Sequence, residues 1–378
     1  MFMNISMSKG VISRGISAPM IKEGDDLVNI VVKSVIDEVK DVKIINVPYY
    51  IDGVRTYKAE EIVTYHLNNK DIIGITESVI ARSMGQYISV DDIAADIEKK
   101  YGKDATINVI NPIYSRNRFS MILKGIARAA SRIVFTMPPL DEVGNPFGVN
   151  PFTGVNIQEY YKEICENENC EVIFLKGLPE DVSNKLYCGL HDYVGWKEVH
   201  VPPTGRTDDM KCYTLADICS DVSPDWGLLG TNKSTEERLK LFPSKEIAQK
   251  VCDEVKVQIK NITGKDVIVC SYGDGCFKDP VGGIWEFADP VTMPAYTDKE
   301  LIESTPNEIK LKAFIDEGTS EEEINKLIKE KKDLVGSMTS QGTTPRLYRD
   351  LLASLMDLTS GSGDRATPII LIQNYFRD

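Results

Sequence analysis

The segment Ser271-Tyr-Gly-Asp-Gly-Cys-Phe-Lys-Asp-Pro-Val-Gly-Gly-Ile-Trp-Glu-Phe-Ala-Asp-Pro290 decides how the rest of the chain is interpreted. It follows Val267-Ile-Val-Cys270, a short apolar run that is typical of a buried strand. Asp274 stands between two glycines where this strand ends, and glycine lets the backbone bend and approach a ligand. With Lys278 and Asp279 close behind, the pattern suits a phosphate bound together with a hard metal ion. The alternative is a tight turn in which Asp274 bonds to its own backbone.

The composition predicts a globular protein with two domains. The chain has 378 residues, of which 42% are hydrophobic and 27% are charged, and this length exceeds one ordinary core. Its net charge of −13 argues against nucleic acid or an anionic membrane as the main partner. Because like charges repel, a nucleotide site in such a chain would need nearby Lys or Arg and a divalent cation.

The sequence shows no segment that is typical of a signal peptide or a membrane span, and we expect a cytoplasmic protein. The eight cysteines form no CxxC pair, which favours buried free thiols in a reducing compartment. The three histidines, His66, His191 and His200, have no metal-binding spacing, so a histidine-rich zinc site is not expected.

The hydrophobic pattern predicts strands that alternate with helices, typical of an α/β or α+β layer. Asp25 and Asp26 are interpreted as caps of a helix that runs to Val39 rather than as ligands. Asp225–Lys233 is expected to lead into a long helix, with Ser234 and Glu237 as a capping box and a break at Pro243. Other expected helices cover 90–101, 119–127, 156–166, 244–263 and 346–358, and expected strands cover 71–77, 105–110, 132–136, 171–175, 267–270 and 368–373.

Two further polar segments are candidates for binding an anion. Ser78 and Arg82 lie four residues apart where a helix is expected to follow a strand, and a hydroxyl and a guanidinium there can bind an anion. Asp364 lies between the glycine-rich Gly361-Ser-Gly363 and a buried strand, as Asp274 does. Neither a Walker A motif nor a GxGxxG motif occurs in the chain.

At these segments the chain resembles the coenzyme F-420-0 gamma-glutamyl ligase family, in a long form with insertions. Ala18–Leu27, which contains a proline followed by GDDL, resembles the family's N-terminal nucleotide-contacting segment. Ile75–Gly85 resembles its KIVSKAEG-like segment, with Arg82 in place of a nucleotide-binding lysine, and Gly227–Asn232 resembles its GVDRSN-like segment. The segments Ser271–Trp285 and Gly361–Asp364 resemble its metal and nucleotide loops.

The resemblance implies an α+β fold of two mixed α/β domains in an intertwined homodimer. It implies GTP as co-substrate, Mg2+ or Mn2+ as metal, and a reaction that joins a carboxylic acid to L-glutamate through an acyl phosphate. Asp274, with Asp279, is expected to bind the metal. The residues expected to bind the nucleotide are Pro19, Met20, Ser78, Arg82, Asn232, Gly361, Ser362, Gly363 and Asp364. No catalytic side chain is assigned.

The chain departs from the family pattern at three positions. Leu229 stands where a second metal-binding aspartate is expected, Gly275 where a Thr or Ser ligand is expected, and Ser362 where a Gln ligand is expected. One carboxylate is a poor cage for a hard cation, although Asp279, Asp364 or Glu286 can compensate. The alternative function is therefore a non-catalytic homologue that binds a nucleotide or a small acid, and gain of activity in Leu229→Asp would distinguish the two. The acceptor acid and the choice of GTP over ATP stay open.

Three regions are expected along the chain. Residues 1–137 form the N-terminal part of a ligase-like core, 138–225 an inserted subdomain, and 226–378 the C-terminal part that carries the metal and nucleotide loops.

Overall fold

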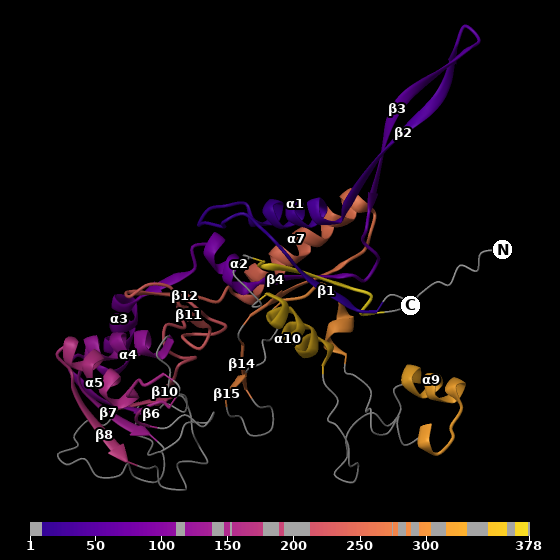
Figure 1. The fold of residues 1–378 in the computed structure, drawn as a ribbon. Helices are drawn as coiled ribbons and strands as arrows, with labels where there is room; N and C mark the ends of the chain where they lie inside the picture. The colour runs from indigo at the N-terminus through magenta and orange to yellow at the C-terminus, as the bar shows by residue number, and fades with distance from the viewer. Residues whose placement is uncertain are drawn as a thin grey trace.

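The protein is a mixed α/β structure with two lobes and a projecting arm (Figure 1). The computed structural model describes residues 10–110, 118–137, 147–151, 153–176, 189–192, 212–273, 275–278, 285–288, 295–303, 315–330, 347–360 and 367–376. The mixed α/β class is confirmed, while the intertwined dimer and the ligase fold type stay predictions.

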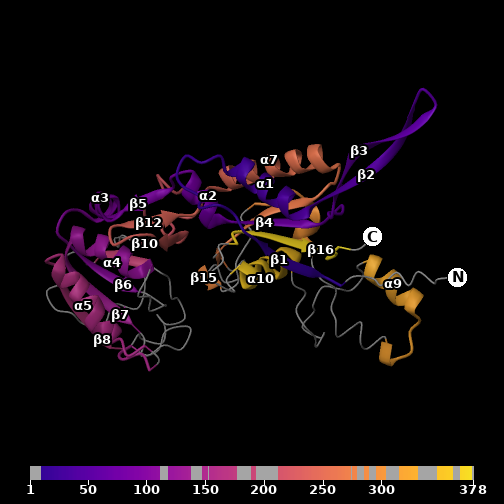
Figure 2. The same cartoon turned by 45° about the horizontal axis from the view of Figure 1, so that its top comes forward.

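The first lobe is built on a four-stranded sheet in the order β1 (Ile12–Ile16), β16 (Ile369–Gln373), β4 (Ile72–Thr76), β13 (Ile268–Tyr272). β4 and β13 are parallel, and the other two pairings are antiparallel. Helices α1 (Leu27–Val39) and α7 (Lys245–Thr263) cover one face, and α10 (Tyr348–Ser360) covers the other with the 3-10 helix Lys299–Ile302 (Figures 1 and 2). The central strands are buried on both faces, which explains their continuous apolar sequences.

Local capping fixes the starts of three helices where the sequence predicts them. Asp26 accepts from the Asn29 backbone at 3.1 Å, Ser244 accepts from Ile247 at 3.2 Å, and Ser89 with Asp92 forms a full capping box. Each side chain satisfies an N–H group that has no partner inside the helix. The interpretation of Asp26 as a cap is confirmed.

The second lobe contains a five-stranded sheet in the order β10 (Cys212–Thr214), β9 (Gly189–Asp192), β6 (Ala105–Ile110), β7 (Ala130–Met137), β8 (Glu171–Lys176). Helices α3 (Val90–Tyr101), α4 (Arg118–Ala129) and α5 (Ile157–Asn167) belong to its core. Three of these strands come from 138–225, so part of this segment extends the sheet that β6 and β7 begin. The predicted domain boundaries stay a prediction.

The lobes are joined at a short helix and a small three-stranded sheet. The helix that the sequence predicts after Lys233 is wrong in this region. α2 (Glu77–Ser83) leads to β5 (Tyr87–Ser89), which pairs with β12 (Arg238–Leu241), and β12 pairs with β11 (Thr231–Lys233). The helix expected after Lys233 is therefore a hairpin. Its turn is closed by hydrogen bonds from the backbones of Ser234 and Thr235 to Arg238, and Leu239 and Leu241 enter the second-lobe core. The burial of Leu239 and Leu241 against distant parts of the chain outweighs the helix preference of the Ser234 and Glu237 capping box.

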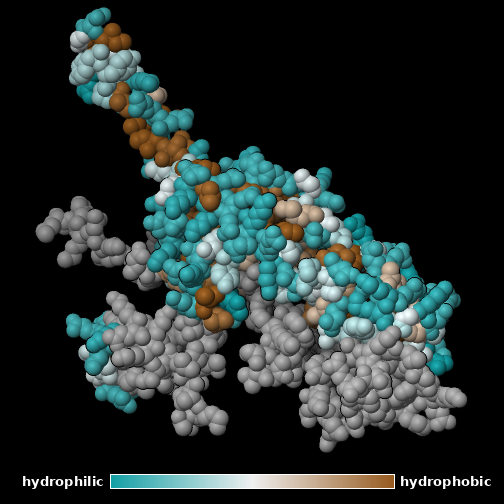
Figure 3. Space-filling model, turned by 180° about the vertical axis from the view of Figure 1, so that it is seen from behind, coloured by the Kyte–Doolittle hydropathy of each residue, from teal (hydrophilic) through white to brown (hydrophobic). Residues whose placement is uncertain are grey.

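A long β-hairpin, here called the arm, projects from the first lobe (Figure 1). It consists of β2 (Lys40–Ile51) and β3 (Val54–Tyr65), joined by Asp52 and Gly53 with positive φ values of 48° and 79°. Large side chains are exposed along it, among them Ile44 at 71% and Tyr50 at 69%. Figure 3 shows hydrophobic residues, coloured brown, along the surface of the arm. An isolated two-stranded hairpin is at best marginally stable in water, so this surface is suited to contact another structure.

The remaining described elements are the hairpin β14 (Gly275–Lys278) with β15 (Trp285–Ala288), and helix α9 (Glu321–Glu330). Five described cysteines, Cys165, Cys170, Cys219, Cys252 and Cys270, are buried free thiols, as predicted. No helix in the described part of the chain has the length and apolar character to cross a bilayer.

Candidate functional site

A polar cluster lies at the carboxyl ends of the two parallel strands, between the lobes. In the β4–β13 register Thr76 pairs with Tyr272, so Glu77 and Gly273 are the next residues on each side. The carboxyl ends of adjacent parallel strands are where open α/β sheets bind ligands. The strand register therefore places the start of α2 beside the start of the Gly-Asp-Gly segment.

Glu77 is the centre of this cluster, and it is only 3% exposed. Its Oε2 accepts a hydrogen bond of 2.8 Å from the Thr76 hydroxyl, and its Oε1 lies 3.4 Å from Nδ2 of Asn232. A Cβ atom added to Gly273 would overlap the Glu77 side chain, so the missing side chain of Gly273 makes the room that the carboxylate occupies. A buried carboxylate is costly unless hydrogen bonds or a positive group compensate it, which points to a specific role here.

The hairpin β11–β12 brings two more polar side chains to the cluster from the second lobe. Asn232 lies 155 positions from Glu77 in the chain, and Lys240 hydrogen-bonds the Ser78 hydroxyl across 162 positions. Lys240 is 9% exposed. The cluster thus contains a carboxylate, an amide, two hydroxyls and an ammonium group from three separate segments.

Tyr272 borders the cluster on the side of α10. Its phenol oxygen is buried and lies near the side chain of Ser360. Burial raises the pKa of this phenol, with smaller contributions from Ser360, which lowers it, and from the Glu77 carboxylate, which raises it. The neutral phenol can donate a hydrogen bond to an oxygen atom at the edge of the cluster.

Five predicted nucleotide-binding residues lie in described segments. The cluster brings together Ser78 and Asn232, whereas Arg82 is exposed one turn further along α2. Met20 is 78% exposed, and its loop contacts the end of α2 through the Gly24 N–H, which donates to the Ser83 carbonyl at 2.9 Å.

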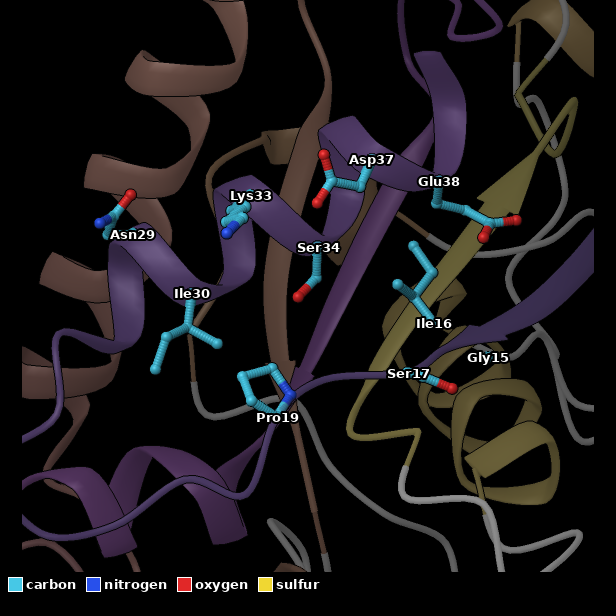
Figure 4. Close-up of a pocket in the computed structure, with 10 residues that line it drawn as sticks. All are labelled: Gly15, Ile16, Ser17, Pro19, Asn29, Ile30, Lys33, Ser34, Asp37 and Glu38. Carbon is cyan, nitrogen blue, oxygen red and sulfur yellow. The ribbon is translucent and has the colours of Figure 1, made fainter. Parts of the chain in front are cut away.

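Pro19 lines a groove of about 870 Å³ between β1 and α1 (Figure 4). Ile16 lines it from β1, and Ile30, Lys33 and Asp37 line it from α1. None of the cluster residues lines this groove. The groove and the cluster are therefore separate, and the chemistry of the cluster makes it the stronger candidate site.

The other predicted site residues, Asp274, Asp279, Gly361, Ser362, Gly363 and Asp364, lie outside the described residues. The prediction for these six residues stays a prediction, and only the residues that precede them are described. Gly273, which precedes Asp274 in the chain, packs against Glu77, and Ser360, which precedes Gly361, lies near enough to Tyr272 to affect its pKa. Gly273 and Ser360 themselves therefore lie at the cluster or beside Tyr272.

Leu229 has a structural role. Its side chain is 1% exposed within the second-lobe core, and its carbonyl accepts a hydrogen bond of 3.0 Å from Arg118. A residue in this environment is not available as a metal ligand. Of Gly275 the structure gives the backbone, paired with Ala288 in β14–β15.

The cluster suits a hard divalent cation in its chemistry. Such ions prefer carboxylate, amide and hydroxyl oxygens, and the cluster contains a residue of each type in Glu77, Asn232 and Thr76, of which Asn232 faces the carboxylate with its Nδ2. Within the described ranges, no group of three or more His, Cys, Asp or Glu side chains is placed to hold a metal ion. A cation here would complete its shell with oxygens from substrate, water or the neighbouring loops.

Sequence reasoning missed Glu77, Lys240 and the arm. The apolar pattern makes Glu77 the last residue of an expected strand, and an acid at the carboxyl end of a buried strand is the same signal that Asp274 gives. Lys240 fell inside a segment predicted to be helical. The arm has a clear signal in Asp52-Gly53, a dipeptide typical of two-residue hairpin turns between apolar runs.

The fold is mixed α/β, and a buried polar cluster lies at the carboxyl ends of two parallel strands. The model of the F420-0:gamma-glutamyl ligase family matches residues 15–374, and the chain belongs to that family. The resemblance found in the sequence is thereby confirmed, and family membership supports an enzyme of the ligase class. A comparison with curated proteins gives no match.

Proposed function

We propose that the protein is a GTP- and divalent-metal-dependent ligase that joins a carboxylic acid, coenzyme F-420-0 or a related acid, to L-glutamate. The observation that carries the proposal is the family match over 15–374. The polar cluster at the carboxyl ends of β4 and β13 supports it, because a phosphoryl-transfer site needs charged and hydrogen-bonding groups around a cation.

The proposed reaction has two steps. The substrate carboxylate attacks the γ-phosphorus of GTP, which forms an acyl phosphate and releases GDP. The amine of L-glutamate then attacks the acyl carbon, inorganic phosphate leaves, and the nitrogen loses a proton as the amide forms. Catalysis of this kind rests on positioning and on neutralising charge.

The residues of the cluster have distinct tasks in this scheme. Lys240 places a positive charge beside Ser78, where it offsets the charge of phosphate oxygens. Asn232 orients the Glu77 carboxylate and offers its own amide to the nucleotide. Glu77, Asn232 and Thr76 supply oxygens for Mg2+ or Mn2+, which when bound screens the phosphate charge from the attacking carboxylate.

We also propose that the protein works as a homodimer, with the arm as a major contact. Both faces of the arm carry exposed apolar side chains, for example Ile44 and Tyr50 on one face and Ile51 and Val54 on the other. A second copy would bury these side chains and add the packing that a two-stranded hairpin lacks.

Calorimetric titration tests the nucleotide site. GTP, and then ATP, is titrated with Mg2+ or Mn2+ into wild type and Asp274→Asn, and each protein is assayed for amide formation from coenzyme F-420-0 and L-glutamate. The proposal expects micromolar, metal-dependent binding of GTP that Asp274→Asn abolishes. Absence of binding to either nucleotide in wild type would overturn it.

The alternative function is a non-catalytic protein of the same fold that binds a nucleotide or a small acid without converting it. The position of Leu229 in the core favours it, because the chain there lacks the expected acidic ligand. Tight GTP binding without amide formation on any tested acid would support this alternative.

A further inference from the structure

The small three-stranded sheet between the lobes has one apolar face and one polar face. Residues that pair in register point to the same side of a sheet, and so do residues two apart along one strand. Ile88 pairs with Leu239, and both belong to the second-lobe core together with Leu241. The opposite side, here called the polar face, therefore carries the alternate residues Tyr87 and Ser89 of β5, Arg238 and Lys240 of β12, and Asn232 of β11.

The polar face contains two cationic residues and no acidic residue. Arg238 and Lys240 are separated by one residue of β12, which places their Cα atoms about 7 Å apart. The chain as a whole has a net charge of −13. A surface of positive charge in an acidic protein favours an anionic ligand, because it offsets the repulsion that the rest of the chain exerts.

Arg238 is exposed, and the ring of Tyr87 holds it in place. Its guanidinium carbon lies 4.2 Å from the centre of this ring, which is a close cation–π contact. No carboxylate of the described residues forms an ion pair with it, whereas the nearby cations Lys124, Arg128 and Lys233 all pair with glutamates. Arg238 thus presents its hydrogen-bond donors in a fixed place to an anion that arrives from solvent.

Lys240 lies deeper on the same face, under α2. It is 9% exposed, and it hydrogen-bonds the hydroxyl of Ser78 in α2. Both cartoons show β12 between α2 and α3 (Figures 1 and 2). The polar face therefore extends from solvent at Arg238 to the cluster, to which Lys240 and Asn232 belong.

We propose that Arg238, supported by Tyr87, binds the carboxylate of the acid substrate. The planar guanidinium matches the two oxygens of a carboxylate, whereas the ammonium of Lys240 is a point charge that suits a phosphate. Two cations at this spacing would hold the carboxylate next to the γ-phosphate that it attacks, as the first step of the proposed reaction requires. The assignment rests on the proposed function for the phosphate at Lys240.

L-Glutamate also carries carboxylates, and the position of Arg238 favours the acid substrate over it. Because Arg238 and Lys240 project from the same side of one strand, an anion at Arg238 lies beside the phosphate at Lys240. In the first step only the acid must come this close to the phosphate. Glutamate reacts later, at the acyl carbon. Separate KM values for the two substrates distinguish these two sources of a carboxylate.

The test compares full-length wild type with Arg238→Gln, Arg238→Lys, Tyr87→Leu and Tyr87→Phe in the presence of Mg2+. KM is measured separately for coenzyme F-420-0, L-glutamate and GTP, and calorimetry measures the binding of coenzyme F-420-0 with GDP present. Thermal unfolding reports the fold of each variant. Arg132→Gln is the matched control, because Arg132 is a partly exposed arginine of the same lobe that pairs with Glu171 at 2.7 Å.

Arg238→Gln is expected to weaken the binding of coenzyme F-420-0 and to raise its KM about 10-fold or more, with unchanged KM values for GTP and L-glutamate. Arg238→Lys keeps the charge without the planar fork and should recover part of the affinity. Tyr87→Leu should weaken binding less than Arg238→Gln does, while Tyr87→Phe keeps the ring and should behave as wild type, as should Arg132→Gln.

Two kinds of result would overturn the proposal. One is unchanged binding of coenzyme F-420-0 in Arg238→Gln, or no binding of it by wild type. The other is a rise confined to the KM for GTP or for L-glutamate, which would assign Arg238 to that ligand instead.

The same measurements separate this site from the proposed function. Amide formation with an unchanged KM for the acid in Arg238→Gln would remove the site and leave the ligase. Binding of the acid that depends on Arg238, without amide formation, would keep the site and remove the ligase.

Discussion

Arg118 of α4 donates a hydrogen bond of 3.0 Å to the carbonyl of Leu229, whose side chain is 1% exposed in the second-lobe core. This contact anchors the chain just before β11, the strand that carries Asn232 to the cluster. Position 229 thus supports the site through packing.

Leu229→Asp is therefore expected to destabilise the protein rather than to create a metal ligand. It removes a buried apolar side chain and places a carboxylate in an apolar core, which together cost about 3 kcal/mol or more. Chemical denaturation would show this as a lower midpoint, with Leu229→Ala as the control for lost packing alone. Wild-type stability combined with tighter Mn2+ binding would contradict the prediction.

Gly273→Ala is expected to displace the Glu77 carboxylate. The added methyl group would overlap the end of the Glu77 side chain, which must then leave its place between Thr76 and Asn232. We expect a loss of about 1–3 kcal/mol in stability and weaker Mn2+ binding. Gly148→Ala is the control, since nothing lies within 4 Å of its Cβ position. Unchanged Mn2+ affinity in Gly273→Ala would argue against the metal site.

The arm is expected to be essential for dimerisation. Ile44→Lys with Tyr50→Lys adds two charges to one apolar face of the arm and should shift the mass in light scattering from dimer to monomer. Glu98→Lys with Glu254→Lys adds as many lysines to exposed positions of α3 and α7 and should leave the mass unchanged. A monomeric wild type, or a dimer that survives the arm variant, would rule out this contact.

Because these thiols are buried, we expect them to react slowly with alkylating reagents. We also expect the folded protein to lose stability at high pH. Burial raises the pKa of Cys219 and of Cys170 to about 12 and also raises that of Cys165, Cys252 and Cys270. At pH 8 these five should resist iodoacetamide in the native protein and react in guanidinium, as peptide mass spectrometry would show. Rapid native labelling of Cys252 would contradict their burial.

The raised pKa values of these thiols determine how the stability of the folded protein changes with pH. Unfolded thiols lose their protons near pH 8.5, whereas the native thiols keep theirs to higher pH, so the unfolded state binds fewer protons above that point. The contribution of these thiols to stability is fully present below about pH 8.5 and is lost as the pH rises toward 12. Denaturation midpoints measured between pH 7 and pH 10 should fall over the upper part of this range.

Features that depend on neighbouring residues were predictable from the sequence. The helix starts at Asp26, Ser89 and Ser244 follow from side chains that bond to an N–H three residues ahead. The buried strands around Ile73 and Val269 follow from continuous apolar runs. The family also followed from the order of its motifs, and the match over 15–374 confirms it.

Features that depend on distant residues were decided only by the tertiary structure. Thr231–Leu241 carries a capping signal, yet it forms a hairpin because Leu239 and Leu241 gain more from burial in the second-lobe core than a short helix gains from a cap. Glu77 became a candidate ligand only when parallel pairing set it beside Gly273 and the hairpin brought Asn232 across 155 positions. The sequence by itself determined the local elements and the family, because their causes are short-range. The tertiary structure alone decided which polar side chains share one buried site, because that depends on how the two lobes pack.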